Sequence, residues 1–175
     1  PLLHPDVPVD VVMHILEGGE LHAWNAQFER LIWKYILGPK YGFPTPKLEQ
    51  YHCSMAQAAA YGLPLALDYA ADVLGVDEQK DREGKRLMLQ MSKPRKRNDD
   101  GTFTWWDDDP EKFQKLYEYC KQDVRAERAI SKRLKPLPPD ERRIYLLDQT
   151  INDRGVFLDV PLAQAAVKCA EIATE

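Results

Sequence analysis

Hydrophobic residues recur at helical spacing along most of the chain, and two short apolar runs interrupt this pattern. The runs at 21–24 and 50–54 predict buried strands, because short apolar stretches bounded by turn residues are typical of strands. Gly38 and Pro39 are expected to end the second of the predicted helices. The predicted helices cover residues 10–17, 26–37, 55–61, 65–74, 80–91, 110–134 and 140–153. The other segments are a Pro-rich lead-in at 1–9, an irregular segment at 92–108, a stiff linker at 136–139, and a short strand, a turn and a helix after Gly155.

The longest predicted helix carries a polar pair beside its apolar face. Tyr119 and Asp123 are four residues apart, so on a helix their side chains lie one above the other. A phenol and a carboxylate presented together beside a buried face suit a metal-bound, water-activating site. Such pairs are also common on the rims of ordinary helices. The apolar face is predicted to consist of Phe113, Leu116, Tyr117, Cys120 and Val124.

A second polar pair lies where the first predicted strand meets the second helix. Asn25 and Glu29, in the segment LHAWNAQFER, are also four residues apart and can face one cleft. A structural role is equally suitable: Asn25 can cap the helix, and Glu29 is favourable near the positive end of the helix dipole.

The composition is that of a soluble chain with one domain, or one domain and the start of another. Of the 175 residues, 44% are hydrophobic and 30% are charged, and the net charge is −4. This charge does not indicate a nucleic-acid binder, so such a function would rest on a local basic patch or on metal ions. Three scattered cysteines without a CxxC pair fit a reducing, intracellular compartment.

The order and spacing of the two polar pairs resemble a known family. Asn-x-x-aromatic-acid at 25–29, followed after roughly ninety residues by Tyr-x-x-x-Asp at 119–123, resembles the second and third motifs of the DEDDy proofreading exonucleases. Farther on, LDQTINDRGVFLDVPLA at 147–163 looks like the start of the polymerase region of family A DNA polymerases. The segment KDREGKRLMLQMSKPRK and the Trp-rich loop after it most resemble bacteriophage versions.

The resemblance implies an α/β, RNase H-like (DnaQ-like) fold and two domains. Residues 1–135 would be a 3′→5′ exonuclease domain, and residues 136–175 a linker and the first helices of a polymerase domain. The parent protein would be a DNA polymerase that removes misincorporated nucleotides from the 3′ primer end with two Mg²⁺ or Mn²⁺ ions. Its partners would be DNA and the remainder of the polymerase chain, with no membrane. The expected location is the cytoplasm of a bacterial or phage-infected cell.

The resemblance also implies roles for single residues. Asp123 is similar to the carboxylate that binds the metal activating the attacking water, and Tyr119 to the tyrosine that orients this water. Glu29 lies where most relatives have Asp, and its extra methylene is compatible with metal coordination through a water. Asn25 and Phe28 would shape the cleft around the 3′-terminal nucleotide. Trp24 departs from the pattern, since phage relatives often have His there.

The first motif of the family, Asp-x-Glu on a hydrophobic strand, has no suitable match. Two acids are too few to hold two ions. Asp81-Arg82-Glu83 has the right letters, but it lies in a charged helix after the second motif and is interpreted as solvated surface. We therefore expect the missing pair upstream of Pro1, a fold without its first strands here, and little or no hydrolysis by residues 1–175 alone.

Three further features leave alternatives open. The basic run SKPRKR at 92–97 could contact DNA phosphates or form an exposed loop. Trp105 and Trp106 could stack on a base, but packing against the long helix is favoured. The four histidines show no metal-ligand spacing along the sequence. For the chain as a whole, the alternatives are a non-catalytic exonuclease-like scaffold that binds primer DNA or braces the polymerase, and a related ribonuclease, which the segment at 152–159 disfavours.

Overall fold

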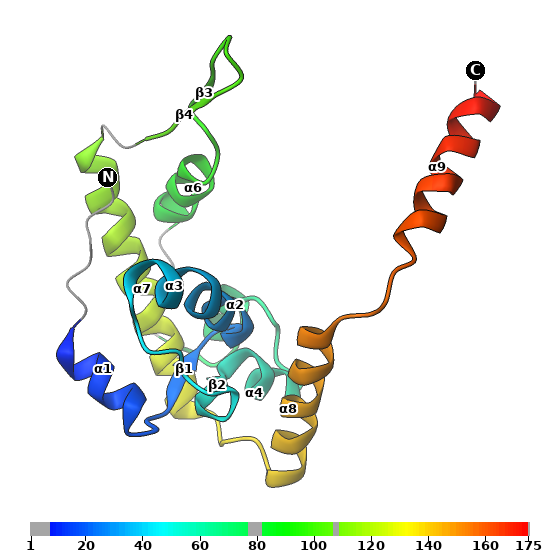
Figure 1. The fold of residues 1–175 in the computed structure, drawn as a ribbon. Helices are drawn as coiled ribbons and strands as arrows, with labels where there is room; N and C mark the ends of the chain where they lie inside the picture. Colours follow the sequence, from blue (N-terminus) through cyan, green and yellow to red (C-terminus); the bar gives the residue numbers. More distant parts are fainter. Residues whose placement is uncertain (1–7, 77–81, 107–108, 175) are drawn as a thin grey trace.

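The computed structural model describes residues 8–76, 82–106 and 109–174, and helices account for most of this part of the chain (Figure 1). The helices are α1 (Val9–Leu16), α2 (Ala26–Ile32), the π-helical turn η1 (Trp33–Leu37), α3 (Gly38–Tyr41), the 3₁₀ turn η2 (Leu48–Gln50), α4 (Ser54–Ala60), α5 (Leu67–Val73), α6 (Arg82–Met91), α7 (Pro110–Arg133), α8 (Pro139–Arg154) and α9 (Val160–Thr174). The strands are β1 (Leu21–Ala23), β2 (Tyr51–Cys53), β3 (Lys96–Arg97) and β4 (Phe103–Thr104).

Strands β1 and β2 form a parallel pair, as the two apolar runs predicted strands at these places. Their register aligns Leu21 with Tyr51, His22 with His52 and Ala23 with Cys53. A parallel pair requires a crossover connection, and α2, η1 and α3 supply it. This strand–helix–strand arrangement is one unit of the kind that α/β proteins repeat, and the predicted RNase H-like fold stays a prediction.

The second predicted helix continues past its expected end. Gly38 and Pro39 begin α3 rather than ending the helix, and Gly42 ends it with a left-handed φ of 73°. The prediction failed because proline in the first turn of a helix sacrifices no hydrogen bond, since the amide hydrogens there have no partner within the helix. One π-helical turn, η1, joins α2 to α3.

Two smaller expectations also differ from the structure. The segment predicted to be irregular contains an antiparallel hairpin, β3–β4, in which Lys96 pairs with Thr104. The strand predicted after Gly155 is absent, and residues 156–159 have no regular structure. The start of the helix predicted at 80–91 lies outside the described residues, as do residues 1–7 of the lead-in.

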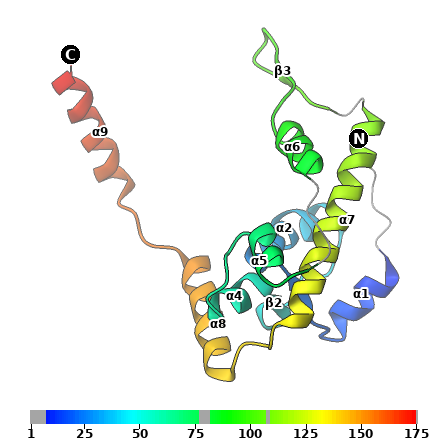
Figure 2. The same cartoon turned by 180° about the vertical axis from the view of Figure 1, so that it is seen from behind.

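Helix α7 buries a different face from the one that its apolar pattern predicts. Its buried residues are Tyr119, Ala126, Glu127 and Ile130, whereas Tyr117 is 41% and Val124 63% exposed. Of the predicted apolar face, Phe113 and Leu116 near the start of α7 pack against α6 and against the loop that holds Trp105 and Trp106, called the tryptophan loop below. The second half of α7 packs against α5, where Ala70 and Ala71 allow close approach and form a core with Ala126 and Ile130 (Figure 2).

The last two helices relate differently to the body. Helix α8 packs on it, with Tyr145 against the core of Ala26, Tyr51 and Cys53. All described side chains of α9 are exposed, and an extended segment separates this helix from the rest (Figure 1). Within the described residues, no helix combines the length and the apolar character that crossing a membrane requires.

Candidate active site

Tyr119 and Asp123 interact directly on α7, as their spacing predicts. The Tyr119 hydroxyl donates a hydrogen bond to the Asp123 carboxylate. Tyr119 is only 5% exposed. Burial, followed by this hydrogen bond, raises the pKa of the phenol, so it stays protonated and able to donate. The predicted pairing is confirmed, while its action on a water stays a prediction.

Glu29 on α2 interacts electrostatically with α7 through Glu127. Its Oε2 atom is cut off from solvent and has no hydrogen-bond partner. Burial raises the pKa of this carboxyl group, and the negative charge of Glu127 raises it further. Glu127 is four residues after Asp123 on α7, so both side chains lie on one side of that helix. Glu29 therefore lies close enough to Glu127 for the two charges to interact.

Glu127 is a residue that the sequence reasoning missed. It is 8% exposed, and the buried Ser54 hydroxyl, at the start of α4, donates a hydrogen bond of 2.5 Å to its Oε1. A signal existed, because Glu127 continues the four-residue spacing that runs from Tyr119 through Asp123. Glu29, Asp123 and Glu127 are referred to below as the carboxylate cluster.

Some buried polar side-chain atoms have no hydrogen-bond partner, and two of them belong to the carboxylate cluster. In the described part of the chain they are Glu29 Oε2, Tyr51 Oη, Gln57 Oε1 and Asp123 Oδ1. These atoms come from α2, β2, α4 and α7, and α2 contacts β2 while α4 contacts α7. Burial raises the pKa of Tyr51 to about 12, and the negative charge of Glu29 contributes to the rise.

Unpaired buried oxygens are uncommon in folded proteins and mark places where a water or an ion is required. Carboxylate oxygens are the hard ligands that Mg²⁺ and Mn²⁺ prefer. The free oxygens of Glu29 and Asp123 therefore fit the ions that the sequence pattern implies.

The residues that precede Glu29 are arranged differently from the sequence prediction. Asn25 has a left-handed φ of 63° and its side chain makes no capping hydrogen bond, so the capping role is wrong. Asparagine tolerates this conformation better than most residues. Asn25 and Phe28 are exposed and accessible to a ligand, and Phe28 is 61% exposed. Trp24 instead packs against the core and donates its indole N–H to the carbonyl of Leu65 at 3.0 Å.

An ion pair between buried Arg30 and partly exposed Asp153 anchors α2, the helix that carries Glu29. Arg30 is 6% exposed and donates two hydrogen bonds to the Asp153 carboxylate on α8, at 2.5 and 2.8 Å, and one to Gln149 at 3.3 Å. Such forked pairing fixes orientation as well as distance. The segment that resembles the start of a polymerase region thus holds α2 in place.

The tryptophan loop packs on α7, as favoured from the sequence. The ring of Trp106 lies beneath Lys112 and Arg95, at 4.8 and 5.5 Å from its centroid, and its N–H donates to the carbonyl of Lys93 at 2.9 Å. An apolar hollow beside it is lined by Met88, Met91, Trp105, Trp106, Phe113 and Leu116. Contact of the basic run with DNA phosphates stays a prediction.

Closely spaced metal-ligand atoms occur away from the carboxylate cluster, at the paired strands β1 and β2. Among the described residues, Glu20, His22 and His52 form the set of three whose ligand atoms all lie within 4.8 Å of one another. They are referred to below as the histidine cluster. Glu29 and Asp123 belong to no such set. Sequence spacing could not indicate the histidine cluster, since strand pairing brings its members together.

The chain is similar to a DNA polymerase of Bacillus phage SP02, with 39% identity over 158 residues. The matched region covers 85% of this chain but only 23% of the phage protein, so the chain spans less than a quarter of its relative's length. No protein-family model and no solved structure matches the chain.

Proposed function

We propose that this chain is part of a DNA polymerase and forms the second and third motifs of its 3′→5′ proofreading exonuclease, of RNase H-like fold. The supporting observations are that the charge of Glu127, one turn beyond the bonded pair Tyr119–Asp123 on α7, acts on Glu29, and that Glu29 and Asp123 each have a buried oxygen without a partner. The similarity to the phage polymerase supports the same proposal.

In this proposal each residue has one task. Glu29 and Asp123 would hold Mg²⁺ or Mn²⁺ through the oxygens that lack a partner. When bound, two such ions activate water and stabilise the charge that develops on the phosphate. The Tyr119 phenol, kept protonated by burial, would donate a hydrogen bond that orients this water. Exposed Phe28 offers a ring on which the terminal base can stack, and Asn25 offers an amide beside it.

Binding of Mn²⁺, measured by the loss of the free-ion electron paramagnetic resonance signal, tests the proposal on this chain. A Glu20→Gln background removes the histidine cluster from the measurement. We expect Asp123→Asn and Glu29→Gln each to weaken binding about tenfold or more. Asp72→Asn, which changes an exposed acid on α5, should leave binding unchanged. Mn²⁺ binding that ignores both Glu29 and Asp123 would overturn the metal-site assignment.

One observation favours a second candidate, a scaffold without catalysis that binds primer DNA or braces the polymerase. Glu29 and Asp123 do not complete a set of three closely spaced ligands in the described residues. A scaffold predicts DNA binding with no dependence of Mn²⁺ affinity on the two carboxylates. The Mn²⁺ titration above therefore separates the two functions.

A further inference from the structure

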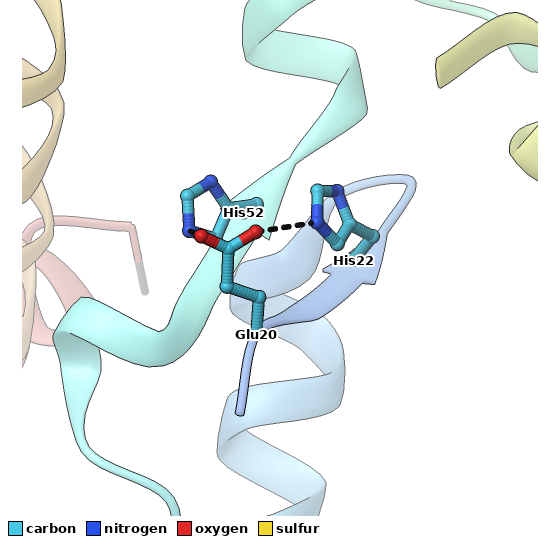
Figure 3. A group of neighbouring side chains, drawn as sticks. All are labelled: Glu20, His22 and His52. Atoms are coloured by element: carbon cyan, nitrogen blue, oxygen red, sulfur yellow. Dashed lines mark hydrogen bonds and ion pairs between the residues drawn. The ribbon is translucent and has the colours of Figure 1, made fainter. Parts of the chain in front are cut away.

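The histidine cluster arises from the pairing of β1 with β2. His22 and His52 are direct neighbours in the parallel register, and their rings stack with centroids 4.9 Å apart and planes inclined by 19°. This separation matches the usual distance of about 4.8 Å between paired strands. Figure 3 shows the carboxylate of Glu20, the residue before β1, lying between the two rings.

We propose that Glu20, His22 and His52 bind one transition-metal ion of the Zn²⁺ class. Nε2 of His22 lies 3.2 Å from Glu20 Oε2, and Nε2 of His52 lies 3.6 Å from Glu20 Oε1. Zn²⁺ bonds of about 2.0 Å in a tetrahedron separate neighbouring ligand atoms by about 3.3 Å. These two separations lie on either side of this value, and the third, between the histidine nitrogens, is within 4.8 Å, so binding requires side-chain rotations that bring the two rings closer at these atoms.

The ligand types select the metal. Two imidazole nitrogens and one carboxylate suit Zn²⁺, Co²⁺ or Ni²⁺, whereas Mg²⁺ and Ca²⁺ prefer oxygen ligands alone. The side chains are 64% (Glu20), 39% (His22) and 22% (His52) exposed. A metal ion can therefore reach the cluster from solvent, and a water can fill the fourth position.

The protonation states also suit metal binding. The hydrogen bond from His22 lowers the pKa of Glu20, which keeps this residue a carboxylate. Burial lowers the pKa of His52, which favours the neutral imidazole that metals require. One charge opposes the ion: Arg142 on α8 lowers both pKa values through its positive charge, although its guanidinium is held by the carbonyl of Glu49 at 2.8 Å. The affinity is therefore expected to be moderate.

A metal ion bound to the histidine cluster would hold β1 against β2, the strands that precede α2 and α4 in the sequence. The chain leaves β1 through Asn25 into α2, and it leaves β2 through Ser54 into α4. A bound ion would thus hold β1 and β2 together. These strands lead into the helix that carries Glu29 and into Ser54, which donates the hydrogen bond to Glu127. Because an ion that binds only the folded state stabilises it, Zn²⁺ should raise the melting temperature.

Zn²⁺ calorimetry and Co²⁺ absorption spectroscopy test the proposal on the whole chain with Cys120→Ser and Cys169→Ser, since both cysteines are exposed and bind zinc. We expect one ion per chain and Co²⁺ bands typical of tetrahedral coordination. Glu20→Gln, His22→Gln and His52→Gln should each weaken binding about tenfold or more. Asp72→Asn, which changes an exposed acid on α5, should change affinity by less than about twofold.

Nuclear magnetic resonance separates loss of a ligand from loss of the fold. In the unsubstituted chain, Zn²⁺ should shift the imidazole signals of His22 and His52. The proposal is overturned if Zn²⁺ does not bind, if binding survives both His22→Gln and His52→Gln, or if the two imidazole signals do not respond.

Discussion

The carboxylate cluster and the histidine cluster differ in burial, in backbone and in how their members meet. The carboxylate cluster lies on helices, and two of its oxygens are buried without a partner. The histidine cluster lies at two paired strands, is open to solvent and already has its ligand atoms close together. Burial without pairing is costly to the fold and indicates function, whereas close ligand geometry on the surface costs little and indicates metal affinity.

The largest expected effect is on the rate of hydrolysis, which should depend on the carboxylate cluster and not on the histidine cluster. On the proposed function, Asp123→Asn in the full-length protein should lower the rate of 3′→5′ hydrolysis about a hundredfold or more, because it removes a ligand of the proposed catalytic ions. Glu20→Gln, its control in the histidine cluster, should leave the rate within about twofold. Release of 3′-terminal nucleotides from labelled DNA measures both. Equal losses in the two variants would mean that the clusters form one site.

The next effect concerns the ion pair that anchors α2, the helix that carries Glu29. Asp153→Asn should lower the free energy of unfolding by about 2–3 kcal/mol, because Arg30 is then left buried without its counter-charge. Asp140→Asn on the same helix is the control, since its side chain is 89% exposed, and it should cost less than about 0.5 kcal/mol. Urea unfolding measures both values.

The pH dependence of the Asp153 effect has a defined sign. The hydrogen bond from Arg30 lowers the pKa of Asp153 from 3.8 in the folded state. The stabilisation is therefore complete above pH 3.8 and is lost as the pH falls through the lower folded value. The difference between the unsubstituted chain and Asp153→Asn should vanish in this acid range, and a difference that stays constant with pH would contradict the ion pair.

A smaller effect compares the two glutamates. Without divalent ions at pH 7, Glu29→Gln should raise the free energy of unfolding by about 1 kcal/mol, a value reduced for partial exposure, because it removes an unpaired buried charge. Glu20→Gln should give no gain, since the pKa of Glu20 is lowered by a favourable contact with His22.

The pH profile provides the check. The pKa of Glu29 is raised above 4.5 in the folded state, so the folded protein binds this proton more tightly than the unfolded chain does. The destabilisation is therefore absent below pH 4.5 and grows as the pH rises through the folded value. Denaturant unfolding at several pH values should show that Glu29→Gln raises the free energy of unfolding only at pH values above 4.5.

The smallest effect is a titration within the histidine cluster. Burial places the pKa of His52 below 6.5, while the negative charge of Glu20 partly offsets this shift. Glu20→Gln should therefore lower the pKa of His52 further, as followed by proton resonance of the ring. Arg142→Gln is the opposing control and should raise it. No response to either substitution would show that the cluster is more open in solution.

Local rules made several features predictable from the sequence. The pair Tyr119–Asp123 follows from four-residue spacing on a helix. The start of α7 follows from Asp109, whose carboxylate accepts the amide hydrogen of Lys112 at 3.1 Å, and from Pro110 in the first turn. These interactions join residues at most four positions apart, so helix geometry alone determines them.

Tertiary structure decided the rest. Which face of α7 is buried depends on α5, and the fixed position of Glu29 depends on Asp153, which is 123 residues from Arg30. The histidine cluster depends on the parallel register of two strands that are distant in sequence. Residue spacing determines contacts within a helical turn, whereas contacts between elements are selected by the burial of whole surfaces, and no local pattern specifies that choice.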